Sequence, residues 1–176
     1  PSRQSTKPGV PLVSVGMHAP EALPLVASIM LGPAALRIGL TAAVWTPPAS
    51  WPEGVRGPSD PTAALAAEIA ALRRRNARLV VSVVDGGANV TAAAWQKLAA
   101  DVVVMIGIGT RKASATALNA HTLLVRPADQ GEGVTSLDIW SASGPSRGVA
   151  LIATAPQGAP RGRDGVLVQH RVLDAD

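Results

Sequence analysis

The feature that most limits the possible folds of this sequence is a pair of valine-rich runs that each end in glycine. Leu79–Val84 is followed by Asp85-Gly86-Gly87, and Val102–Ile106 is followed by Gly107-Ile108-Gly109-Thr110. Continuous apolar runs of this length are typical of strands buried on both faces of a sheet. Because a helical pattern precedes each run, the sequence predicts an α/β core.

Two helices are predicted to lead into these strands. Asp60 can accept hydrogen bonds from first-turn amides, and Pro61 suits the first helical position, so a helix is expected over Thr62–Arg75. Its apolar face would carry Leu65, Ile69 and Leu72, with a stop at Asn76. The second helix is expected over Thr91–Ala100.

The segments on either side are predicted to be mainly strands. Leu23–Leu31 and Leu36–Val44, joined by Gly32-Pro33, are expected to form an antiparallel hairpin. Further strands are expected at Pro11–Val15, His121–Val125, Val134–Ser141, Gly148–Thr154 and Gly165–Val172, and a short turn or helix at Ala115–Ala120. The predicted fold is α/β: a mixed sheet with flanking helices and a C-terminal antiparallel meander.

Composition is consistent with one folded domain. The 176 residues are 47% hydrophobic and 16% charged, a globular balance. We expect residues 1–9 to form an N-terminal arm and residues 10–176 a single α/β domain. The sequence has no cysteine, so disulfides and cysteine-bound zinc are excluded within it. No apolar run reaches the length of a membrane span.

The net charge of +4 does not by itself indicate a nucleic-acid partner. The one basic cluster, Arg73-Arg74-Arg75 with Arg78, falls at the end of the predicted helix, where cations complement the helix dipole. Aromatic residues for base stacking are nearly absent, with four Trp and no Phe or Tyr. No nucleic acid is therefore expected as a partner.

Candidate chemistry falls at the two glycine-rich strand ends. Asp85 is a candidate metal ligand, although an Asp before Gly-Gly is also common in plain turns. Gly107, Gly109 and Thr110 are candidates for binding a phosphate through backbone amides. The spacing matches no standard phosphate-binding motif. His18, His121 and His170 are spread along the chain without ligand spacing, so structural roles are expected for them.

The order of elements over residues 10–140 resembles a known family. The segments that carry the resemblance are Val10–Val15, Leu36–Leu40, Asp60-Pro61, Leu79–Val84, Asp101–Val104, Thr122–Pro127, Gln130-Gly131 and Val134–Asp138. Together they resemble the second half of the catalytic domain of calcineurin-like metallophosphoesterases, in particular the bacterial 5′-nucleotidase branch. The resemblance implies half of a four-layer α/β sandwich, in a family that binds two metal ions.

In that family, histidines at two strand ends bind the metals. The first histidine position falls on Asp85 here, and the Gly-His-x-His motif falls on residues 107–110, with Ile108 and Thr110 at its histidine positions. Asp85 keeps an oxygen ligand for a hard cation, whereas an isoleucine side chain cannot bind a metal. The family's first half, which carries further ligands, would precede residue 10.

These differences predict a degenerate, non-catalytic metallophosphoesterase-like chain that serves as a structural or binding subunit of a larger assembly. Its partners would be other protein subunits or a missing N-terminal half, because an isolated half leaves one sheet face uncovered. The alternative is a fragment of a split, metal-dependent phosphohydrolase, in which Asp85 helps to bind divalent metal ions. No cofactor is expected otherwise. The family branch implies an extracytoplasmic, periplasmic location.

Overall fold

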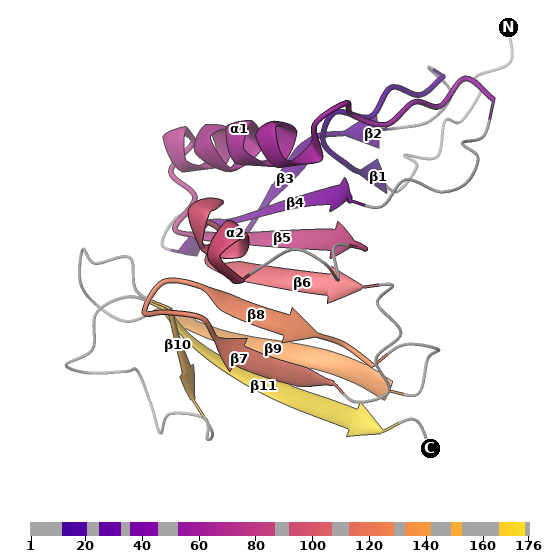
Figure 1. Ribbon diagram of the computed structural model, residues 1–176. Coiled ribbons are helices and arrows are strands. Elements are labelled where there is room, and N and C mark those ends of the chain that lie inside the picture. Colours follow the sequence, from indigo (N-terminus) through magenta and orange to yellow (C-terminus); the bar gives the residue numbers. More distant parts are fainter. Residues whose placement is uncertain are drawn as a thin grey trace, which may run out of the picture.

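The chain folds around a six-stranded mixed sheet with helices on one face (Figure 1). The computed structural model describes residues 12–20, 25–32, 36–45, 53–86, 92–106, 113–128, 133–141, 149–152 and 166–174. Their elements are β1 (Leu12–Val13), β2 (Leu25–Val26), β3 (Ser28–Leu31), β4 (Ile38–Val44), α1 (Pro61–Arg74), β5 (Leu79–Asp85), α2 (Ala92–Lys97), β6 (Val102–Ile106), β7 (Ser114–Ala117), β8 (Leu123–Arg126), β9 (Gly133–Ser141), β10 (Val149–Ile152) and β11 (Val166–Asp174).

The main sheet has the strand order β3-β4-β5-β6-β8-β7. The four central strands, β4, β5, β6 and β8, run parallel to one another, and the edge strands β3 and β7 are antiparallel to their neighbours. This arrangement confirms the predicted fold class, a mixed α/β sheet with flanking helices. The predicted antiparallel hairpin is also confirmed, since Ser28 pairs with Thr41 and Leu31 with Ile38.

Helix α1 forms where the sequence predicts it. The Asp60 carboxylate accepts a hydrogen bond from the Ala63 amide at 3.0 Å, and Pro61 is the first helical residue. The predicted apolar face is confirmed, because Leu65, Ile69 and Leu72 are all buried. The helix ends at Arg74, and Asn76 takes a left-handed backbone conformation with φ of 65° that stops the helix.

The two faces of the sheet are covered differently. On the helix side, the core joins Val80, Val84 and Val103 of the sheet to the buried residues of α1 and to Trp95 of α2. On the other side, Leu79, Val102, Leu123 and Val125 form a second cluster, against which Leu137 of β9 packs. Within the part of the chain that the structure describes, neither helix is long and apolar enough to cross a membrane.

Three strand predictions differ from the structure. A turn or helix was predicted over Ala115–Ala120, but Ser114–Ala117 form strand β7, because pairing with the edge of β8 outweighs the helical preference of alanine. The predicted strand over residues 23–31 is divided into β2 and β3. The C-terminal strands are not a meander: β11 lies between β9 and β10 and runs parallel to β10. The long connection over residues 153–165 permits such a parallel crossover.

Gly39 of β4 allows α1 to approach the sheet closely. A Cβ atom added there would lie 2.9 Å from both Cδ1 and Cδ2 of Leu72, whose side chain is fully buried. We therefore expect Gly39→Ala to lower the free energy of unfolding by about 1–3 kcal/mol, measured by urea denaturation.

A double-mutant cycle with Leu72→Ala identifies the cause of this loss. If contact with Leu72 is responsible, the cost of Gly39→Ala shrinks when Leu72 is replaced by alanine. An equal cost in both backgrounds would contradict the proposed contact.

Candidate functional site

In α/β proteins, ligand-binding and active sites usually lie at the carboxyl ends of the parallel strands. Asp85 is the last residue of β5, and its side chain is exposed there. Its backbone carbonyl accepts a hydrogen bond from the Trp45 amide at 2.8 Å, and the Gly86 amide donates to the Ile106 carbonyl at 3.0 Å. These bonds place Asp85 between the ends of β4 and β6, as the sequence predicts for a strand-end residue.

Two tryptophans pack close to this edge. The ring centroids of Trp45 and Trp95 lie 5.0 Å apart with the ring planes inclined by 55°. Trp95 is only 1% exposed and belongs to the core beneath the helices. The pair therefore closes the core at the end of β4, which gives it a packing role.

The described residues do not by themselves fit a two-metal centre. Among them, no three or more His, Cys, Asp or Glu side chains gather closely enough to hold a metal ion. Asp85 supplies one carboxylate, whereas a two-metal site needs several oxygen and nitrogen ligands in fixed positions. Gly107, Gly109 and Thr110, together with Ile108, lie outside the described residues, so their predicted phosphate site stays a prediction.

The histidines lie on separate segments. The His18 backbone forms an isolated bridge with Arg56 through hydrogen bonds of 2.9 and 2.8 Å. The His121 amide donates to the Asn119 side-chain oxygen at 2.6 Å in an exposed turn before β8. His170 lies on β11, opposite Leu137 of β9. The backbone contacts of His18 and His121 are those of turns and bridges.

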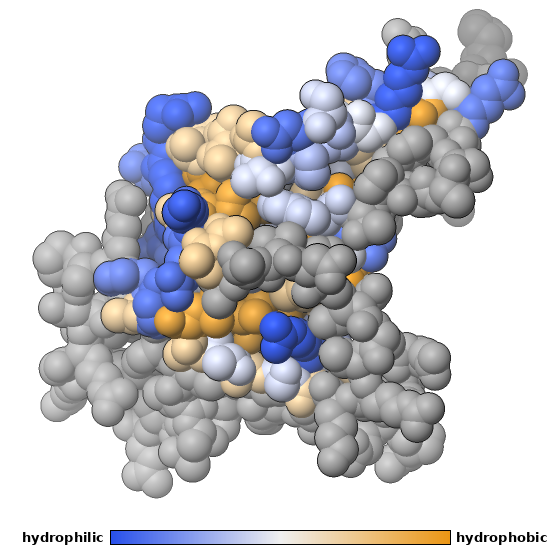
Figure 2. All heavy atoms as spheres, viewed as in Figure 1, coloured by the Kyte–Doolittle hydropathy of each residue, from blue (hydrophilic) through white to orange (hydrophobic). Residues whose placement is uncertain are grey.

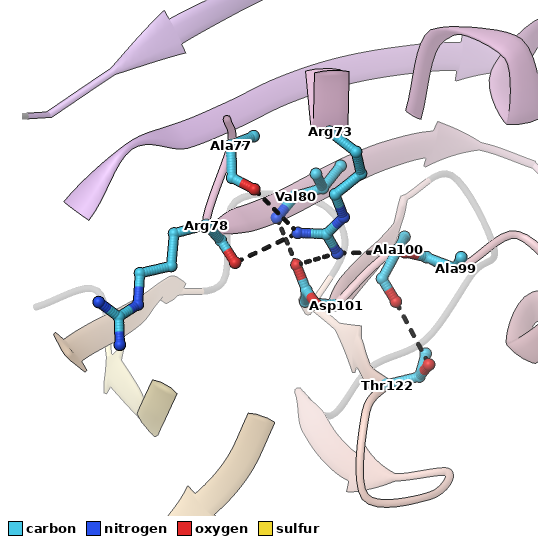
Figure 3. A network of polar contacts seen from close by, with 8 residues as sticks. All are labelled: Arg73, Ala77, Arg78, Val80, Ala99, Ala100, Asp101 and Thr122. Atoms are coloured by element: carbon cyan, nitrogen blue, oxygen red, sulfur yellow. Dashed lines mark hydrogen bonds and ion pairs between the residues drawn. The ribbon is translucent and has the colours of Figure 1, made fainter. Parts of the chain in front are cut away.

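At the opposite ends of the parallel strands, Asp101 and Arg73 form a network of polar contacts (Figure 3). The Oδ2 atom of Asp101 lies 2.6 Å from Nη2 of Arg73 and accepts a hydrogen bond from the Val80 amide at 2.5 Å. The Asp101 side chain is 5% exposed and that of Arg73 is 15% exposed. Water therefore screens this ion pair less than it would screen a surface pair.

The Arg73 guanidinium is also bonded to three backbone carbonyls. Nη1 donates to the carbonyls of Ala77 and Arg78, each at 3.2 Å, and Nη2 donates to the Ala99 carbonyl at 3.2 Å. One side chain thus joins the end of α1 to the start of β5 and to the turn before β6. The sequence predicts a basic cluster at the helix end, but Arg73 and Asp101 lie 28 positions apart and no local pattern predicts their pairing.

A hollow of about 360 Å³ opens beside this ion pair. Its other polar lining residues include Gln96, Asn119, His121 and Thr122. Gln96 donates to the Leu118 carbonyl at 3.1 Å, and Thr122 donates to the Ala100 carbonyl at 3.2 Å. These polar groups already form hydrogen bonds within the chain. We therefore interpret the hollow as a surface feature of the contacts that hold the helices to the sheet.

Comparison with known proteins supports the fold. No protein-family model and no curated protein matches the sequence. The sulfate thiohydrolase SoxB of Thermus thermophilus, a 5′-nucleotidase-like metallophosphoesterase whose structure was solved with glycerol, has a TM-score of 0.62 at 14% identity. That match covers 92% of this chain but 28% of SoxB.

A second solved structure, a hypothetical protein that also comes from Thermus thermophilus, has a TM-score of 0.39 at 18% identity, covering 61% of this chain and 40% of that one. The similarity to SoxB shows the fold alone. The resemblance predicted from the sequence is thus supported as a metallophosphoesterase-like fold.

The ion pair between Arg73 and Asp101 should be essential for stability. Arg73→Met leaves the nearly buried Asp101 carboxylate without its cation, so we expect a loss of about 3–5 kcal/mol in the free energy of unfolding. The matched control is Arg74→Met, which removes an exposed arginine from the next helical position and should change stability by about 0.5 kcal/mol or less. Similar losses in the two variants, followed by thermal or urea denaturation, would refute a special role for Arg73.

Proposed function

We propose that this chain is a metallophosphoesterase-like structural or binding part of a larger assembly, and that it contributes an apolar sheet face to which a partner binds. The observation that carries the proposal is the exposure of that face. It is the side of the main sheet opposite α1 and α2, over strands β3 to β6, and is called the open face below.

The open face is apolar except at the carboxyl end of β5, where Asp85 follows Val83 on the same side. Side chains alternate along strands, so every second residue of β3–β6 points to this side. Its partly or largely exposed residues are Ile29, Leu31, Ile38, Leu40, Ala42, Val44, Val81, Val83, Val104 and Ile106. Leu31 is 47% exposed and Ile106 is 37% exposed. Removal of such side chains from water stabilises an interface by roughly 25 cal/mol per Å² of apolar area.

The helix side of the same strands shows the contrast. There, Thr41, Ala43, Val80 and Val84 are buried beneath the helices. Figure 2 views this helix side and shows hydrophilic residues gathered around the C-terminal end of α1. Apolar surfaces as continuous as the open face usually mark interaction sites in soluble proteins.

A second candidate function rests on Asp85. Its exposed carboxylate stands at the carboxyl end of a central parallel strand, opposite Ile106, the last residue of β6. In this alternative, the chain is one part of a split phosphohydrolase, and other ligands to divalent metal ions come from another part of the assembly. An extracytoplasmic location is proposed for both functions, on the family resemblance alone.

A charge placed on the open face tests the first proposal. In the isolated chain, Val83→Lys can lay its methylene stem on the sheet and keep its ammonium group in water, so folding should be little affected. In the assembly, that charge would be buried without a partner, and we expect binding at least about tenfold weaker by sedimentation of the purified assembly. The control, Ala67→Lys, adds the same charge to the exposed side of α1 and should leave binding unchanged. Equal effects of both variants would count against the open face.

Native mass spectrometry with metal analysis separates the two candidate functions. If the chain is a non-catalytic subunit, we expect it to be bound to another polypeptide without stoichiometric metal. If it is part of a split phosphohydrolase, about two metal ions should accompany the assembly. Asp85→Ala should then lower phosphatase activity and metal content, whereas Glu53→Ala, which removes another exposed carboxylate, should not.

A further inference from the structure

Strand β3 forms one edge of the main sheet without the residues that usually protect such an edge. Among the strands that the structure describes, only β4 pairs with it. Natural sheet edges commonly carry charged residues or proline, which prevent a further strand from adding to the sheet. The sequence of β3, Ser28-Ile29-Met30-Leu31, contains neither. The outer edge of β3 is therefore suited to pairing with another strand.

The bonds of β4 show how its backbone groups are shared between its neighbours. A central strand directs these groups alternately to the two sides. The Trp45 amide, directly after β4, donates to the Asp85 carbonyl of β5, so the odd-numbered residues of β4 bond to β5. The Ala42 carbonyl fits this alternation, because it accepts a hydrogen bond from the Val15 amide and not from β5. The even-numbered residues of β4 therefore bond on the side of β3.

This alternation identifies the backbone groups of β3 that point outward. The even-numbered residues of β4 lie opposite Ile29 and Leu31, which therefore use their N–H and C=O groups on β4. Ser28 and Met30, which alternate with them, direct their N–H and C=O groups to the outer edge. The edge thus offers backbone donors and acceptors at two positions that flank Ile29.

We propose that a second copy of this chain pairs with this edge, antiparallel and with the twofold axis at Ile29. In this register, Ser28 of one copy lies opposite Met30 of the other, and the two Ile29 residues lie opposite each other. Every outward N–H and C=O group of Ser28 and Met30 then has a partner, and the two main sheets join into one. The pairing uses the backbone edge of β3, so it does not depend on the partner proposed for the open face.

The side chains at this edge favour a second copy over an unrelated strand. On the side away from the helices, Ile29 would pack against its own counterpart, and β-branched residues suit such cross-strand pairs. On the helix side, the Ser28 hydroxyl donates to Oε1 of Glu68 at 2.5 Å and accepts from Nη1 of Arg75 at 3.4 Å. The twofold axis reverses the order of these two charges in the second copy. Glu68 of one copy is thereby brought towards Arg75 of the other.

Disulfide trapping tests the register, because the chain has no cysteine of its own. In the proposed dimer, the Cα atoms at position 29 lie about 4.5 Å apart, and a disulfide spans about 4.4–6.8 Å between Cα atoms. Position 31 lies farther along the strand, so its two Cα atoms would be roughly 13 Å apart. We expect Ile29→Cys, but not Leu31→Cys, to form a disulfide-linked dimer on a non-reducing gel. Leu31 is a strict control, because at 47% exposure it is open to random collision.

Opposite charges at position 29 test the dimer without a covalent bond. Ile29→Lys or Ile29→Glu places like charges directly opposite each other, which destabilises a strand pair. We expect the Kd of the dimer, from sedimentation equilibrium, to rise at least about tenfold for either variant alone and to recover when the two are mixed. Val83→Lys changes the open face but not the edge, so it should leave the dimer intact. Circular dichroism of each variant verifies that the chain still folds.

These outcomes separate the proposed dimer from its alternatives. Equal crosslinking at positions 29 and 31, or a native chain that stays monomeric at high concentration, would overturn the proposal. A dimer that Val83→Lys dissociates while the charges at position 29 do not would also overturn it, because the copies would then meet through the open face. A monomeric chain leaves the proposed function standing, since that function requires only a partner on the open face.

Discussion

A parallel sheet needs cover on both faces, and the rest of this structure depends on how that need is met. Helices α1 and α2 cover one face, with Leu65, Leu72 and Trp95 close against the strands. On the other face, Leu137 of β9 packs against a buried cluster that includes Leu79 of β5 and Val102 of β6, whereas Val83 and Ile106, nearer the carboxyl ends of these strands, are partly exposed. The second hydrophobic core is therefore less completely covered than the first.

The two edges of the parallel strands have different roles. At the amino end, Asp101 and Arg73 form an ion pair with each other and hydrogen bonds with backbone groups. These contacts hold the junctions between helices and strands in place. At the carboxyl end, Asp85 is exposed, and its side chain has no partner among the described residues. The stabilising ion pair thus lies at the amino ends of the parallel strands, whereas a catalytic site in this kind of fold would lie at their carboxyl ends.

Much of the fold could be predicted from local sequence, because its signals are local. The Asp60-Pro61 cap, the apolar spacing of α1 and the run over β6 each identify an element from neighbouring residues. The turn or helix predicted over Ala115–Ala120 was wrong for residues 115–117, because their pairing with the edge of β8 makes them a strand. The pairing of Arg73 with Asp101 was missed for the same reason, since no local pattern connects the two residues. At the candidate site, sequence placed Asp85 at a strand end, but it could not show which ligands, if any, surround it.

The prediction that Leu79–Val84 is buried on both faces explains why a partner is needed. It holds for Leu79 and Val80, which are fully buried, but Val81 and Val83 are partly exposed in the isolated chain. A strand that faced water on one side would normally alternate apolar with polar residues. Strand β5 instead carries valine at positions 81 and 83, so its sequence suits burial on both faces of the sheet. In the isolated chain, only the face beneath the helices is fully covered along this strand. A partner on the open face would remove this mismatch, because it would cover Val81 and Val83.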